Sequence, residues 1–71
     1  MTPHLQLQNE AFRLHGLIQE GEILESEGRA GAYACGEQLG VSKSDQRHII
    51  ESCLKGIRAG ARQRIKGAIE E

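Results

Sequence analysis

The chain has 71 residues, of which 38% are hydrophobic and 3% aromatic, and its formal net charge is −1. This length allows one domain, and sixteen Leu, Ile, Val and Phe side chains exceed the composition typical of disorder. A chain this short buries only roughly 60% of its unfolded surface, so we expect a partner chain to supplement a thin core. No apolar run approaches the roughly 20 residues that cross a bilayer, which excludes a membrane-spanning helix.

Two cysteines, Cys35 and Cys53, allow at most one disulfide. The N-terminal sequence MTPHLQLQNEAF lacks the cationic stretch and apolar block of a secretory signal. We therefore expect a cytoplasmic protein with reduced thiols.

The first predicted helix runs from about Pro3 to Glu27. Thr2 is suited to cap it, Pro3 to occupy its first position, and Gly28 to end it. The apolar residues of this segment recur at helical spacing: Leu5, Leu7, Ala11, Phe12, Leu14, Leu17, Ile18 and Leu24.

Residues 29–39 predict a short second helix, and residues 40–42 predict a turn. Ser42 or Ser44 can cap the next helix. Residues 43–69 form an amphipathic third segment that Gly56 and Gly60 can divide in two. We expect a small all-α domain over residues 1–71, with two long amphipathic helices flanking a short one, and expect it to dimerise. Antiparallel packing of the first and third segments would bring Leu17 to Leu54 and Leu14 to Ile57.

The charge is segregated along the chain. Residues 1–40 contain six acidic and two basic side chains, and residues 41–69 contain two acidic and seven basic ones. Four acidic residues would crowd the end of the first helix: Glu20, Glu22, Glu25 and Glu27. Four basic residues at helical spacing predict a stripe that suits either phosphates or an acidic partner surface: Lys55, Arg58, Arg62 and Lys66.

The most informative segment is ACGEQLGVSKSDQRHII, residues 34–50. Five of its residues are small, apolar or turn-forming at characteristic positions: Gly36, Leu39, Gly40, Val41 and Ile49. This segment resembles the helix-turn-helix of phage repressors and related regulators. It departs from their pattern at Gln46, where a buried aliphatic residue is usual. The same residues also fit a plain interhelical turn with a serine cap.

The resemblance implies a recognition helix that begins near Lys43. The expected groove contacts are Lys43, Ser44, Arg47 and His48, and the expected phosphate contacts are Lys55, Arg58 and Arg62. The sequence thus predicts a small DNA-binding transcriptional regulator, acting as a homodimer, of the compact kind carried by phages and plasmids.

An alternative prediction is a helical hairpin or dimer that binds another protein as an inhibitor, adaptor or chaperone. Three observations favour it: the polar Gln46, the near-neutral total charge, and the matched lengths of the first and third segments. We expect no enzyme, cofactor or metal site, because His4 and His15 would lie roughly 16 Å apart along a helix and the cysteines lack ligand spacing.

Overall fold

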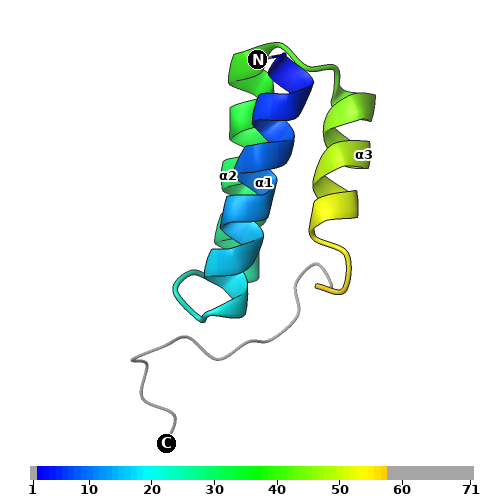
Figure 1. The fold of residues 1–71 in the computed structure, drawn as a ribbon. Helices are drawn as coiled ribbons and strands as arrows, with labels where there is room; N and C mark the ends of the chain where they lie inside the picture. Colours follow the sequence, from blue (N-terminus) through cyan, green and yellow to red (C-terminus); the bar gives the residue numbers. More distant parts are fainter. Residues whose placement is uncertain (1, 58–71) are drawn as a thin grey trace, which may run out of the picture.

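The computed structural model describes residues 2–57, which form three helices. These are α1 (Pro3–Gln19), α2 (Glu25–Leu39) and α3 (Lys43–Cys53). Figure 1 shows α2 running back along α1, and α3 descending beside them in the same general direction as α1. No strand occurs among the described residues, which confirms the all-α class.

The first helix is shorter than predicted. Its N-terminus is as expected, with Pro3 at the first position and the Thr2 hydroxyl accepting a hydrogen bond from Leu5 N at 3.2 Å. It ends at Gln19 because Gly21 then takes a positive φ of 75°, which reverses the chain. The predicted continuation to Glu27 is therefore wrong.

The second helix is correspondingly longer, with 15 residues. The Glu27 carboxylate accepts from Leu24 N at 2.9 Å and helps to start this helix. Gly28, which we predicted to end the first helix, lies inside α2. There its missing side chain allows close packing, since a Cβ atom would lie 2.5 Å from Ile18 Cδ1.

The third helix begins at Ser42, one of the two predicted caps, whose hydroxyl accepts from Asp45 N at 3.2 Å. It ends at Cys53, with Leu54 as its C-cap, and Gly56 follows with a positive φ of 94°. The predicted interruption of residues 43–69 near Gly56 is therefore confirmed. Gly60 and the rest of residues 58–71 lie outside the described residues.

The helices enclose one core between them. Within residues 2–57 the buried apolar side chains are Leu7, Ala11, Leu14, Ile18, Ala32, Val41, Ile50 and Leu54. Half of these belong to α1, so α1 is the element against which the other two pack.

The predicted antiparallel pairing of the first and third segments is wrong. His4 meets Asp45, and further along both helices the Cys53 thiol lies 3.9 Å from the Gln8 carbonyl oxygen. Residue numbers rise together along the contact, so α1 and α3 run in the same direction. The reason is the length of α2, which returns the chain to the start of α1 before α3 begins.

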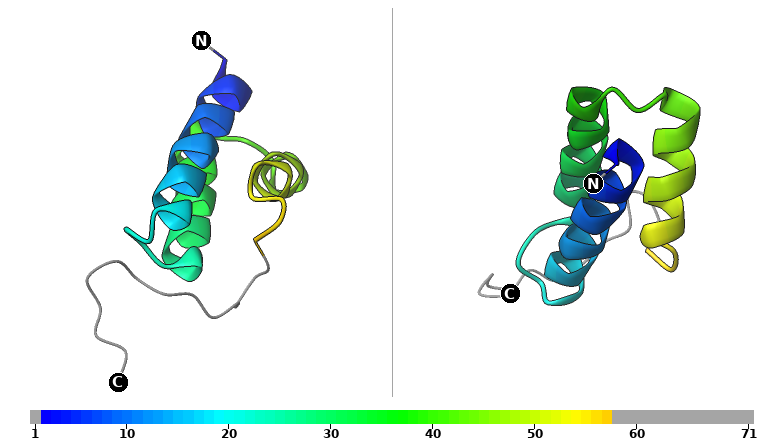
Figure 2. Two further views of the ribbon diagram at one scale, coloured as in Figure 1. Left: turned by 60° about the horizontal axis from the view of Figure 1, so that its bottom comes forward. Right: turned by 45° about the horizontal axis from the view of Figure 1, so that its top comes forward.

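Figure 2 shows that α3 is strongly inclined to the other helices. In its left view α3 is seen nearly end-on while α1 and α2 are seen from the side. None of the described helices is both long and apolar enough to span a membrane.

Candidate nucleic-acid interface

The connection between α2 and α3 is a three-residue turn. Gly40 adopts the left-handed conformation (φ 77°, ψ 20°), which lets the Val41 amide donate back to the Gly36 carbonyl at 3.0 Å. Val41 is buried and fixes the turn on the core. Short turns that contain glycine join the two helices both of helical hairpins and of helix-turn-helix motifs.

Gln46 occupies the inner face of this corner and is 2% exposed. Its side-chain amide donates to the Val41 carbonyl at 2.7 Å and to Glu37 Oε2 at 3.1 Å. It packs on Gly36, where a Cβ atom would lie 2.7 Å from Gln46 Cγ. The polar residue at the expected aliphatic position is thus hydrogen-bonded and joins α2, the turn and α3, so it does not leave an unsatisfied polar group in the corner.

The outer face of α3 carries the side chains predicted to contact a DNA groove. Lys43, Ser44, Arg47 and His48 are all exposed, while Gln46 and Ile50 of the same helix are buried. The Lys43 side chain is 88% exposed and its Nζ lies 3.1 Å from Glu37 Oε2. The structure therefore brings these four residues together on one short helix.

The predicted phosphate contacts are less well defined. Lys55 is exposed but lies in the turn after α3, so a helical stripe that includes it is wrong. Arg58 and Arg62 lie outside the described residues, as does Lys66.

A hydrogen bond joins the start of α3 to the start of α1. His4 Nε2 lies 2.9 Å from Asp45 Oδ2, and both side chains are about half exposed. The hydrogen bond from His4 is the main reason that the pKa of Asp45 lies below its ordinary value, and the Ser42 hydroxyl adds to it although slight desolvation opposes the shift. This contact, between residues 41 positions apart, holds the N-terminus of α3 in place.

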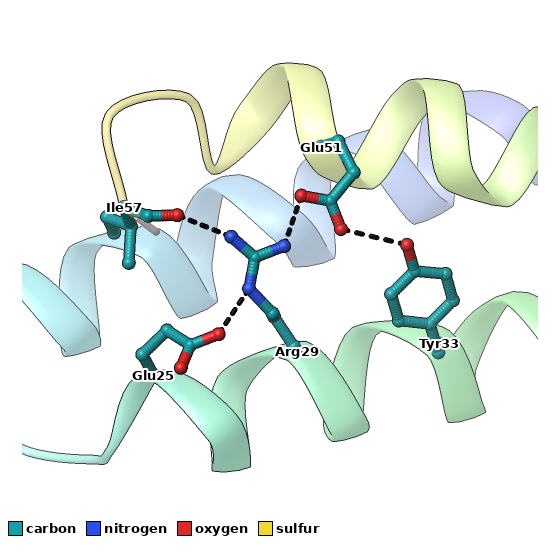
Figure 3. Close-up of polar contacts among 5 residues, drawn as sticks. All are labelled: Glu25, Arg29, Tyr33, Glu51 and Ile57. Carbon is teal, nitrogen blue, oxygen red and sulfur yellow. Dashed lines mark hydrogen bonds and ion pairs between the residues drawn. The ribbon is translucent and has the colours of Figure 1, made fainter. Parts of the chain in front are cut away.

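Arg29 connects α2 to the far end of α3 (Figure 3). Its guanidinium donates to Glu25 on its own helix, to Glu51 on α3 and to the carbonyl of Ile57 after α3. The Tyr33 hydroxyl also donates to Glu51, at 2.9 Å. The Arg29 side chain is 13% exposed and that of Glu25 only 3%, so this half of the cluster is largely removed from water, whereas the Glu51 side chain is 42% exposed.

Arg29 and Glu51 in this cluster each stabilise the ionised form of the other. Burial works against the ionised form of Glu51, but the hydrogen bonds from Arg29 and Tyr33 outweigh it and lower the pKa of Glu51. Burial likewise opposes the charge on Arg29, and the Glu51 and Glu25 carboxylates more than compensate and raise its pKa. Burial and the Glu51 charge raise the pKa of Tyr33.

The acidic residues predicted to crowd the end of the first helix are placed differently. Glu25 and Glu27 lie in the first turn of α2, where the helix dipole favours an anion. The prediction that these two residues crowd the end of the first helix is therefore wrong.

Two shallow clefts lie next to these elements. One, of about 480 Å³, lies between α2 and α3 and is lined by Tyr33, Ala34, Glu37, Lys43, Gln46 and Arg47. The other, of about 450 Å³, lies between α1 and α2 and is lined by Gln6, Asn9, Glu10, Arg13, Cys35 and Leu39.

Within residues 2–57 no group of three or more His, Cys, Asp or Glu side chains is placed to hold a metal ion. Cys35 and Cys53 are free thiols, and partial burial raises the pKa of each.

Sequence reasoning missed two features that orient α3. The spacing of Glu25 and Arg29 is an i, i+4 signal for an ion pair, but nothing in the sequence indicates that Arg29 also reaches Glu51. The His4–Asp45 pair has no local signal at all. No protein family, curated protein or solved structure matches this chain.

Proposed function

We propose that this protein is a small DNA-binding regulator that inserts α3 into the major groove. The observation that carries the proposal is the exposed row of Lys43, Ser44, Arg47 and His48 on a short, inclined helix that follows a three-residue glycine turn. Arginine and lysine donate to guanine in the groove, and serine and histidine add further hydrogen-bonding groups.

The electrostatics of α3 support this assignment. The acidic side chains of α3 are both engaged within the fold, Asp45 with His4 and Glu51 with Arg29 and Tyr33. Of the two cations of α3, Lys43 pairs with Glu37, whereas Arg47 takes part in no ion pair within residues 2–57. The outer face therefore offers cations to a polyanion while its carboxylates are partly neutralised from inside.

We further propose that the protein acts as a homodimer, because a single recognition helix reads few base pairs and dimers of such motifs read two half-sites. Phe12 and Leu5, which are 55% and 45% exposed, lie seven residues apart on α1 and provide apolar surface for self-association.

The direct test is binding of labelled duplexes from a random-sequence library, followed by anisotropy titrations at about 50 and 200 mM salt. We expect enrichment of one sequence and an affinity that falls steeply as salt increases. Absence of duplex binding even at low ionic strength would overturn the proposal.

A second candidate is a protein-interaction module that acts as an inhibitor, adaptor or chaperone. The exposed Phe12 and Leu5 favour it, because they lie on α1, away from the proposed groove contacts on α3. A pull-down from lysate with and without nuclease separates the candidates. Partners that disappear with nuclease support DNA binding. Partners that persist with nuclease and are lost in a Phe12→Ser variant support the interaction module.

A further inference from the structure

The carboxylate of Glu37 lies in the cleft between α2 and α3, at the edge of the proposed DNA-binding face. One of its oxygens, Oε2, accepts hydrogen bonds from Lys43 Nζ and from Gln46 Nε2, both at 3.1 Å. Arg47 lines the same cleft. Two donor side chains of α3 therefore hold an anionic group of the chain itself, and the cation of Arg47 lies along the same cleft.

The donors suit the oxygens of a phosphate as well as those of a carboxylate. An ammonium and an amide are both side-chain groups that bind phosphate oxygens in nucleic-acid complexes. The Gln46 amide is held in a fixed direction, because it is 2% exposed and also donates to the Val41 carbonyl at 2.7 Å. It is a preorganised donor at the base of the cleft.

Glu37 is held there weakly. The side chains of Glu37 and Lys43 are 57% and 88% exposed, and ion pairs at such exposure contribute little to stability. Hydrogen bonding from Gln46, assisted by Lys43, lowers the pKa of Glu37, so its carboxylate stays charged at neutral pH. An incoming phosphate can therefore replace one anion by another at small cost to the fold.

We propose that Lys43 and Gln46 form a phosphate site that Glu37 occupies as an internal competitor, and that a phosphate of the nucleic-acid backbone displaces it. In this arrangement Lys43 contacts the backbone, while Arg47 contacts a base. The inference rests on the proposed function only for the source of the phosphate, which is DNA. The donors themselves can bind the oxygens of any phosphate group. Glu37 as a competitor weakens the contacts to the phosphate backbone, which do not depend on base sequence. A larger share of the binding free energy then comes from contacts to the bases.

The test compares Glu37→Gln, which keeps a hydrogen-bond acceptor but removes the charge, with Glu20→Gln. The control removes the same charge from the C-cap of α1, outside the cleft. We expect Glu37→Gln to strengthen duplex binding about threefold to fivefold, as the release of an exposed ion pair allows, and Glu20→Gln to change it less than about twofold. Adding Lys43→Ala to Glu37→Gln should abolish the gain.

A second measurement uses inorganic phosphate and follows the Gln46 side-chain amide by NMR. We expect phosphate to shift this resonance at lower concentration in Glu37→Gln than in the unmodified protein or in Glu20→Gln. A different outcome is that the unmodified protein binds no duplex while the Gln46 amide still responds at the lowest phosphate concentration in Glu37→Gln. In that case the proposed function fails, and the site is a binding site for free phosphate. If the two substitutions affect the Gln46 amide equally, or neither makes it respond, the inference is overturned.

Discussion

Gly36 and Gln46 fit together so closely that a Cβ atom on Gly36 would lie 2.7 Å from Cγ and 2.9 Å from Cδ of Gln46. Gln46 has no room to move aside, because its amide is bound to the Val41 carbonyl and to Glu37. The corner between α2 and α3 therefore depends on the absence of a side chain at position 36.

We expect Gly36→Ala to destabilise the protein by about 1–3 kcal/mol, the usual cost of overpacking a tight contact. Gly16→Ala is the matched control, because a Cβ atom there has nothing within 4 Å. That change should stabilise α1 by about 0.5–1 kcal/mol through helix propensity. Urea denaturation of both variants checks the prediction, and equal effects in the two variants would contradict it.

The Arg29 cluster supplies the second prediction. Arg29→Met removes the cation that joins Glu25, Glu51 and the Ile57 carbonyl, and should lower the free energy of unfolding by about 3 kcal/mol. Arg13→Met is the control, because Arg13 pairs with Glu10 on the solvent side of α1 and its loss should be hardly measurable. Similar melting temperatures for the two variants would show that the Arg29 cluster does not stabilise the folded protein.

The third prediction concerns pH. The pKa of Glu51 lies below its ordinary value of 4.5 in the folded chain, because the hydrogen bonds from Arg29 and Tyr33 outweigh the effect of burial. A lowered folded-state pKa contributes stability that is complete above the unfolded pKa and is lost as the pH falls through the folded one. Stability should therefore decline as the pH falls below about 4.5.

Glu51→Gln should flatten this decline, since the substituted side chain has no proton to bind. Urea denaturation between about pH 3 and 7 measures the slope for both proteins. An unchanged slope in the variant would assign the acid sensitivity to other carboxylates.

The fourth prediction tests the recognition helix. Arg47→Ala should weaken binding to the selected duplex by at least about tenfold and relax the preference at one base pair, as loss of a groove contact does. Arg13→Ala removes the same charge from α1 and should leave the sequence preference unchanged. Anisotropy titrations against the selected and scrambled duplexes distinguish the two effects. Equal losses would indicate that only net charge matters.

The fifth prediction concerns the exposed face of α1. Phe12→Ser should hardly change stability, because Phe12 is 55% exposed, whereas Leu7→Ala at a fully buried position should cost about 2–5 kcal/mol. If α1 forms the dimer contact, Phe12→Ser should also shift the protein towards the monomer in sedimentation equilibrium. A dimer of unchanged affinity would exclude this face of α1.

The sequence by itself determined the all-α class, the helix caps at Thr2 and Ser42, and the turn at Gly40. These features depend on local chemistry: a side-chain oxygen placed to accept from an amide two or three residues ahead, or a glycine that tolerates positive φ. The exposed positions on α3 also follow from helical periodicity alone.

Only the tertiary structure decided where the first helix ends and how α3 lies. Gly21 and Gly28 are both glycines near the same boundary, but one reverses the chain and the other provides space for Ile18. The parallel course of α1 and α3 follows from the full length of α2. Long-range pairs such as His4–Asp45 then fix that arrangement, because residues far apart in sequence meet only after the helices have packed.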